Sequence, residues 1–106
     1  MIPEVTPSEL ARELAAENPP RLLDVREGYE LEVSRIDPVI HIPLGELPQR
    51  MGELDKDANW VIVCRSGARS GRATAFLLGQ GFRSVRNLSR GMNGWSSDVD
   101  PTQPQY

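Results

Sequence analysis

The amino-acid sequence predicts an α/β fold in which a mostly parallel sheet is covered by helices on both faces. Short apolar segments typical of strands alternate with segments of helical periodicity along most of the 106 residues. The strand-like segments are continuously apolar, which is typical of parallel strands buried on both faces. Such folds bind ligands beyond the carboxyl ends of their strands, where helices begin. We therefore expect a functional site at a strand-to-helix junction.

The first half of the chain opens with a helix-start pattern. Thr6 can cap a helix, Pro7 suits the first helical position, and Glu9 completes a capping box. The Asn-Pro-Pro sequence at 18–20 ends this helix. The elements predicted next are a short strand over 22–25, a brief helix or turn over 27–36, a strand over 39–43 and a helix over 44–54.

The second half contains the most convincing strand, residues 59–64, which is a nearly continuous apolar run. A helix is predicted within the segment 70–82, ending at Gly79 or Gly81, followed by a last strand over 84–89 and a turn or short helix over 91–97. The length allows one domain, residues 1–106, with a core of about 6–97 and a C-terminal tail over 98–106.

The composition argues against several kinds of function. A net charge of -3 does not favour binding to nucleic acid or to an anionic membrane. The apolar runs are far shorter than the roughly 20 residues needed to cross a bilayer. One cysteine and one histidine can form neither an internal disulfide nor a zinc site. The first residues show no signal-peptide pattern, so we expect a cytoplasmic protein that needs no metal.

The only cysteine, Cys64, stands at the end of the strand over 59–64, where the apolar run gives way to small, hydroxylated and cationic residues. A lone cysteine after such a strand is often only a small buried hydrophobic residue. Here the next residues make a poor core and a good anion site: Arg65, Ser66, Gly67, Ala68, Arg69 and Ser70. Backbone N–H groups, a helix N-terminus and two guanidinium groups all favour a thiolate over a thiol. We interpret Cys64 as a nucleophile in a loop that also receives an anion.

The segment "CRSGARS", preceded by "DVRE" and "IPLGEL" and followed by "GFRSVRNLSRGMNGW", resembles the rhodanese family of sulfurtransferases. The resemblance runs from about Thr6 to Trp95 and implies a parallel sheet of about five strands between helices. It also implies that Cys64 attacks the outer sulfur of a donor such as thiosulfate and becomes a persulfide. That persulfide would pass to cyanide, a thiol or a protein, with no cofactor beyond the covalent intermediate.

The same resemblance implies roles for the residues around Cys64. The backbone from Arg65 to Ser70 would cradle the persulfide and the incoming anion, and Arg65 and Arg69 would guide the donor. Asp24 and Arg26, from the "DVRE" segment, would support the site as an ion pair or through hydrogen bonds; the alternative to a direct contact with substrate is an ordinary pair at the end of a strand.

The passage "EVSRIDPVIHIP" departs from the Gly-His-Ile-Pro-Gly-Ala type found in many rhodaneses. This variant and the tail "DVDPTQPQY" resemble the rhodanese domains fused to ubiquitin-activating-like enzymes of molybdopterin and thiocarboxylate biosynthesis. The resemblance implies a ubiquitin-like sulfur carrier protein as an acceptor. A cysteine desulfurase persulfide is an equally reasonable donor.

Two other readings stay open at the level of sequence. A cysteine-dependent phosphatase or arsenate reductase also uses a thiolate in an anion-binding loop, but its signature is Cys-x5-Arg. Here only four residues separate Cys64 from Arg69, which favours sulfur transfer. A rhodanese-fold module that only binds proteins is the second reading, and loss of the cysteine would be its usual sign.

Overall fold

The computed structural model describes all 106 residues and contains a five-stranded sheet in which every pair of neighbours is parallel. The strand order is β1-β5-β4-β2-β3. The strands are β1 (Glu4–Val5), β2 (Arg21–Asp24), β3 (Ile40–His41), β4 (Asn59–Val63) and β5 (Ser84–Leu88). The predicted α/β class with its parallel sheet is confirmed.

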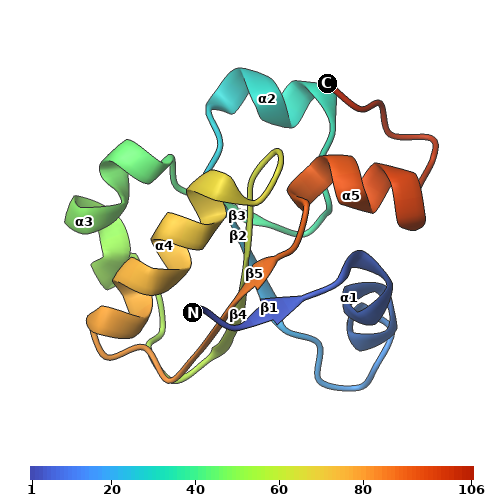
Figure 1. Cartoon of the computed structure of the whole chain (residues 1–106). Helices are drawn as coiled ribbons and strands as arrows, with labels where there is room; N and C mark the ends of the chain where they lie inside the picture. The colour runs from blue at the N-terminus through green and yellow to red at the C-terminus, as the bar shows by residue number, and fades with distance from the viewer.

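Helices cover both faces of this sheet (Figure 1). α1 (Pro7–Leu14) and α5 (Gly91–Asp98) lie on one face, and α3 (Leu47–Arg50) and α4 (Ala68–Gly79) lie on the other. α2 (Gly28–Val33) lies at the end of the molecule where β2 leaves the sheet. None of these helices has the length and apolar composition that crossing a membrane would require.

The central strand β4 shows why its sequence is apolar without interruption. Trp60 and Ile62 belong to the core on the α4 face, whereas Val61 and Val63 belong to the core on the α1 and α5 face. Successive side chains of a strand point to opposite faces, so a strand covered on both faces needs apolar residues at every position. Trp95 of α5 is 7% exposed and packs in the second of these cores.

The predicted start of α1 is also observed. Thr6 Oγ1 accepts a hydrogen bond from the N–H of Glu9 at 3.1 Å, and Glu9 Oε1 accepts one from the N–H of Thr6 at 2.9 Å. This reciprocal pair satisfies two backbone donors that a helix start would otherwise leave exposed.

The segment 44–54 departs from the single helix that its apolar spacing predicts. It forms 3₁₀ turns at Leu44–Glu46 and Met51–Glu53 on either side of the one-turn α3. Glycines at 45 and 52 and the proline at 48 lower its helical propensity.

The edge strands also differ from the sequence-based expectation. β3 is only two residues long, instead of the predicted 39–43, and prolines at 38 and 43 flank it. The two-residue strand β1 was not predicted, because it is too short to show a pattern. It is held by hydrogen bonds from the N–H groups of Asn87 and Ser89 of the neighbouring segment.

Candidate active site

Cys64 is the first residue after β4, at the carboxyl end of the central strand of the sheet. It is 1% exposed, and the loop that follows it leads directly into α4. The start of α5 holds this loop in place. The N–H of Met92 donates to the Cys64 carbonyl at 2.8 Å, and the N–H of Asn93 donates to the Arg65 carbonyl at 3.1 Å.

Two hydrogen-bond donors lie against the sulfur. The N–H of Gly67 and the hydroxyl of Ser70 are each 3.1 Å from Cys64 Sγ. Gly67 has a φ of 103°, in the left-handed region that favours glycine, and this conformation turns its N–H toward the sulfur at the N-terminus of α4. The sulfur is therefore placed where the backbone and the helix both favour a negative charge.

Asn87 of β5 extends this hydrogen-bond network. Its Nδ2 donates to the Gly67 carbonyl and to Glu4 Oε2, both at 3.1 Å. These two contacts turn Oδ1 toward Ser70, whose hydroxyl hydrogen-bonds to it. Ser70 has one proton, so Cys64 Sγ and Asn87 Oδ1 are alternative acceptors for it.

Arg69 forms an ion pair with Glu30 of α2. Its two terminal nitrogens lie 2.7 and 2.8 Å from the two carboxylate oxygens. The Glu30 side chain is 5% exposed, and the hydrogen bonds from Arg69 lower its pKa from 4.5 to about 2, although burial acts in the opposite direction. The same contact raises the pKa of Arg69 above its ordinary value. The charge of Arg69 is thus paired with a carboxylate, and two of its N–H groups are engaged by it.

Asp24 and Arg26 form an ion pair with no exposed surface, and their charged groups are 2.7 Å apart. Arg26 also donates to the carbonyls of Glu30 and Ser34, so it fastens α2 to the end of β2. No hydrogen bond joins either residue to Cys64. The pair supports the helix that carries Glu30.

The remaining loop residues face solvent. Arg65, Ser66 and Ala68 are exposed, so solutes reach the loop from their side. Arg65 has no carboxylate partner, and its guanidinium carbon lies 5.0 Å from the centre of the Tyr106 ring. Arg65 is therefore the cation of this loop with hydrogen-bond donors that remain open to an anion.

The structure shows no cluster of three or more residues able to hold a metal ion. His41 lies with Nε2 2.7 Å from the carbonyl oxygen of Arg26 and thus has a structural contact. A cavity of about 400 Å³ lies elsewhere, between the end of α1, the start of β2 and the segment before β3. None of its lining residues belongs to the Cys64 loop.

Comparison with known proteins identifies the family. The Rhodanese-like domain family matches residues 6–98. The chain belongs to the rhodanese family. A sulfurtransferase of Allochromatium vinosum is 38% identical over 96 residues, which cover 91% of this chain and 90% of that one. The crystal structure of a rhodanese-related protein from Thermoplasma volcanium has a TM-score of 0.84 at 28% identity and covers 92% of this chain and 93% of that one.

The rhodanese domain also resembles parts of larger proteins. The adenylyltransferase and sulfurtransferase MOCS3-1 of Zea mays is 35% identical over an alignment of 103 residues that covers 90% of this chain and 22% of that protein. The predicted likeness to rhodanese domains fused to such enzymes is confirmed at this level. Together, these relatives support sulfurtransferase activity in general.

Three residues of this site were not predicted: Glu30, Asn87 and Tyr106. Asn87 had no distinct signal, since its strand also contains Ser84 and Arg86, which are polar and only partly buried. Glu30 is a carboxylate that the fold buries, and its partner Arg69 is 39 residues away in the chain. Tyr106 had no signal in the sequence.

Proposed function

We propose that this rhodanese carries a sulfane sulfur on Cys64 as a persulfide. The donor is thiosulfate or a protein persulfide, and the acceptor is cyanide, a thiol or a sulfur-carrier protein. The observation that carries the proposal is the position of Cys64 Sγ, 3.1 Å from both the Gly67 N–H and the Ser70 hydroxyl at the start of α4. These donors suit a thiolate and the anionic terminal sulfur of a persulfide.

The reaction has two displacement steps. The Cys64 thiolate attacks the outer sulfur of thiosulfate, the sulfur–sulfur bond of the donor breaks, and its electron pair leaves with sulfite. The acceptor then attacks the outer sulfur of the persulfide, and the electron pair of that bond returns to Cys64 as thiolate. Both steps need charge stabilisation at sulfur, and neither needs a cofactor or a general base.

The two arginines have different tasks in this proposal. Arg65 meets the anionic sulfur donor, because the N–H groups of its guanidinium are open to solvent. Arg69 is paired with Glu30, so it acts mainly by fixing the loop and the start of α4 against α2. The backbone from Arg65 to Ser70 has the role of cradling the outer sulfur and the incoming anion, a role that the Gly67 N–H at 3.1 Å from Cys64 Sγ supports. Asp24 and Arg26 act at a distance, by holding α2.

The decisive experiment measures intact mass after incubation with thiosulfate. We expect the protein to gain one sulfur atom, cyanide to remove it, and Cys64→Ala to gain none. Hydrolysis of an aryl phosphate, without transfer from thiosulfate, would instead assign a phosphatase. Failure of every sulfur donor to form an adduct would assign a protein-binding module.

A sulfur-carrier protein is the acceptor that the resemblance to MOCS3-1 supports, and a cysteine desulfurase is a second source of sulfur. We place the reaction in the reducing cytoplasm, where the thiolate survives between turnovers. Labelled sulfur loaded on Cys64 should move to the activated C-terminus of the carrier protein. Retention of the label on Cys64 would exclude that acceptor.

A further inference from the structure

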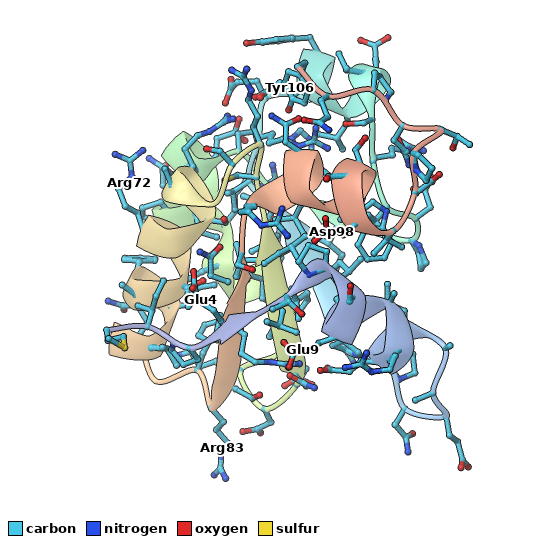
Figure 2. All side chains as sticks on the ribbon, turned by 45° about the vertical axis from the view of Figure 1, so that its right-hand side comes forward. Glu4, Glu9, Arg72, Arg83, Asp98 and Tyr106 are labelled. Carbon is cyan, nitrogen blue, oxygen red and sulfur yellow. The ribbon has the colours of Figure 1, made fainter.

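The segment after α5 returns to the end of the molecule where α2 lies (Figure 1), and its last residue, Tyr106, contacts Arg65 of the Cys64 loop. The side-chain amide of Asn93 holds the backbone of Tyr106 at two points, accepting from its N–H at 3.0 Å and donating to its carbonyl at 3.1 Å. The side chain of Gln103 hydrogen-bonds in the same two-sided way to the backbone of Arg35. Tyr106 is thus held at the end of the molecule where α2 lies, opposite Arg83 (Figure 2).

The Tyr106 side chain contacts the groups that set the charge of the loop. Its hydroxyl accepts from Arg26 Nη1 at 2.8 Å and donates to Glu30 Oε1 at 2.9 Å, the carboxylate that holds Arg69. The Arg65 guanidinium lies over its ring, 5.0 Å from the centroid. One side chain therefore touches Arg65 directly and Arg69 through Glu30.

An aromatic ring holds an arginine differently from a carboxylate. A carboxylate partner, like Glu30 for Arg69, neutralises the guanidinium and occupies its donors. A ring restricts the orientation of the guanidinium and leaves its charge and its N–H groups available. Arg65 is a long exposed side chain with no ion-pair partner, so the ring is its main restraint.

We propose that Tyr106 is a positioning residue that holds Arg65 at the mouth of the Cys64 loop for an anionic sulfur donor. The inference rests on the proposed function, since it assumes that the donor reaches Cys64 past Arg65. It gives the segment after α5 a role in donor binding. The Tyr106 hydroxyl fixes the ring, and the ring fixes the arginine.

The test is a double-mutant cycle on Tyr106 and Arg65. We expect Tyr106→Leu to raise the KM for thiosulfate about two- to fivefold with little change in kcat, the range for an exposed cation–π contact. Tyr106→Phe keeps the ring and should have a smaller effect. In the Arg65→Ala background, Tyr106→Leu should cause no further rise. An unchanged KM, or the same rise in both backgrounds, would overturn the proposal.

Asn93→Ala gives a second route to the same answer if Tyr106→Leu folds poorly. It releases the Tyr106 backbone without altering the ring, and should raise the KM in the wild-type background only. An equal rise in the Arg65→Ala background would count against the proposal.

A second measurement separates this proposal from the proposed function. Sulfate should slow alkylation of Cys64 by neutral iodoacetamide, and protection should weaken in Tyr106→Leu only while Arg65 is present. If protection by sulfate depends on both Tyr106 and Arg65 but no sulfur is transferred, the role of Tyr106 stands and the proposed function is wrong. If sulfur is transferred but protection does not depend on both residues, the proposed function stands and the role of Tyr106 is wrong.

Discussion

At the scale of single residues, the site consists of one sulfur atom, the hydrogen-bond donors that contact it and the two arginines of its loop. Cys64 Sγ has a backbone donor from Gly67 and a side-chain donor from Ser70. The two arginines are not equivalent, because Glu30 engages Arg69 and leaves Arg65 as the open cation. The short loop thus contains one arginine that is paired with a carboxylate, Arg69, and one that is open to an anion, Arg65.

Ser70→Ala should slow the alkylation of Cys64 at neutral pH, because the anionic form of the sulfur loses one of its two hydrogen-bond donors. A hydrogen bond to a charged group contributes about 1.5–3 kcal/mol, so the rate should fall about tenfold or more. The measurement is the rate of alkylation by iodoacetamide at neutral pH. Ser66→Ala is the matched control, because Ser66 lies in the same loop but is exposed and makes no hydrogen bond to the sulfur. Equal rates in the two variants would contradict the role of Ser70.

Asn87 should act in the opposite direction. Its Oδ1 competes with the sulfur for the single proton of Ser70. Asn87→Leu removes this competitor at nearly constant volume, so Cys64 should be alkylated faster at neutral pH. In Ser70→Ala the same substitution should leave the alkylation rate unchanged, because the shared hydroxyl proton is absent. A slower rate in Asn87→Leu would show that the hydrogen bond from Asn87 to the Gly67 carbonyl matters more.

At the scale of elements, the sequence predicted those that rest on local patterns. The capping box of Thr6 and Glu9 and the apolar run of β4 each depend on residues close together in the chain. β1 and β3 depend on pairing with distant strands, and each has only two residues, so local patterns could not define them.

The same reasoning explains which part of the site was predicted. The loop around Cys64 is continuous in sequence, so its small, hydroxylated and cationic residues could be identified together as a candidate anion site. Glu30 and Tyr106 join it from 39 and more residues away in the chain, through contacts that only the folded topology creates. The roles of Glu30 and Tyr106 could therefore be recognised only from their hydrogen bonds and burial in the folded protein.

The start of α5 should be intolerant of a side chain at Gly91. A Cβ there would lie 2.3 Å from the Cys64 carbonyl oxygen, and the φ of 54° favours glycine. These contacts are to backbone atoms, so Gly91→Ala should displace the Cys64 loop and lower the free energy of unfolding by about 1–3 kcal/mol. Urea unfolding measures this change, and the alkylation rate of Cys64 reports the displaced loop.

Gly79→Ala is the control for that substitution. Gly79 is the last residue of α4, and nothing lies within 4 Å of an added Cβ. Alanine there should be neutral or stabilising by up to about 1 kcal/mol. Equal effects at the two positions would show that the close approach at Gly91 does not restrain the loop.

At the scale of the whole molecule, α2 is joined to the rest of the fold mainly by charge. Arg26, two residues after β2, donates to the carbonyls of Glu30 and Ser34 within and just after α2, and Glu30 binds Arg69 at the start of α4. The Tyr106 hydroxyl connects these two residues, because it accepts a hydrogen bond from Arg26 and donates one to Glu30. The stability of the fold and the charge of the site therefore depend on the same carboxylate.

The fold should lose stability in acid through Glu30. Its pKa is lowered from 4.5 to about 2, first by the hydrogen bonds from Arg69. Because the folded state binds this proton more weakly than the unfolded chain does, the stabilisation is complete above about pH 4.5 and is lost as the pH falls toward 2. Glu30→Gln should lower the free energy of unfolding at pH 7 by about 1–3 kcal/mol and flatten its decline in that window. Urea unfolding at a series of pH values measures both effects.

Glu53→Gln is the matched control for this dependence on pH. Glu53 binds Arg50 at two points, at 2.9 and 3.2 Å, but its side chain is 54% exposed. Water already solvates that pair, so its loss should change stability little at any pH. The difference between the two variants isolates the effect of burying the ion pair between α2 and α4. A Glu30→Gln protein as stable as the wild type at pH 7, with an unchanged acid profile, would show that α2 is held by its other contacts.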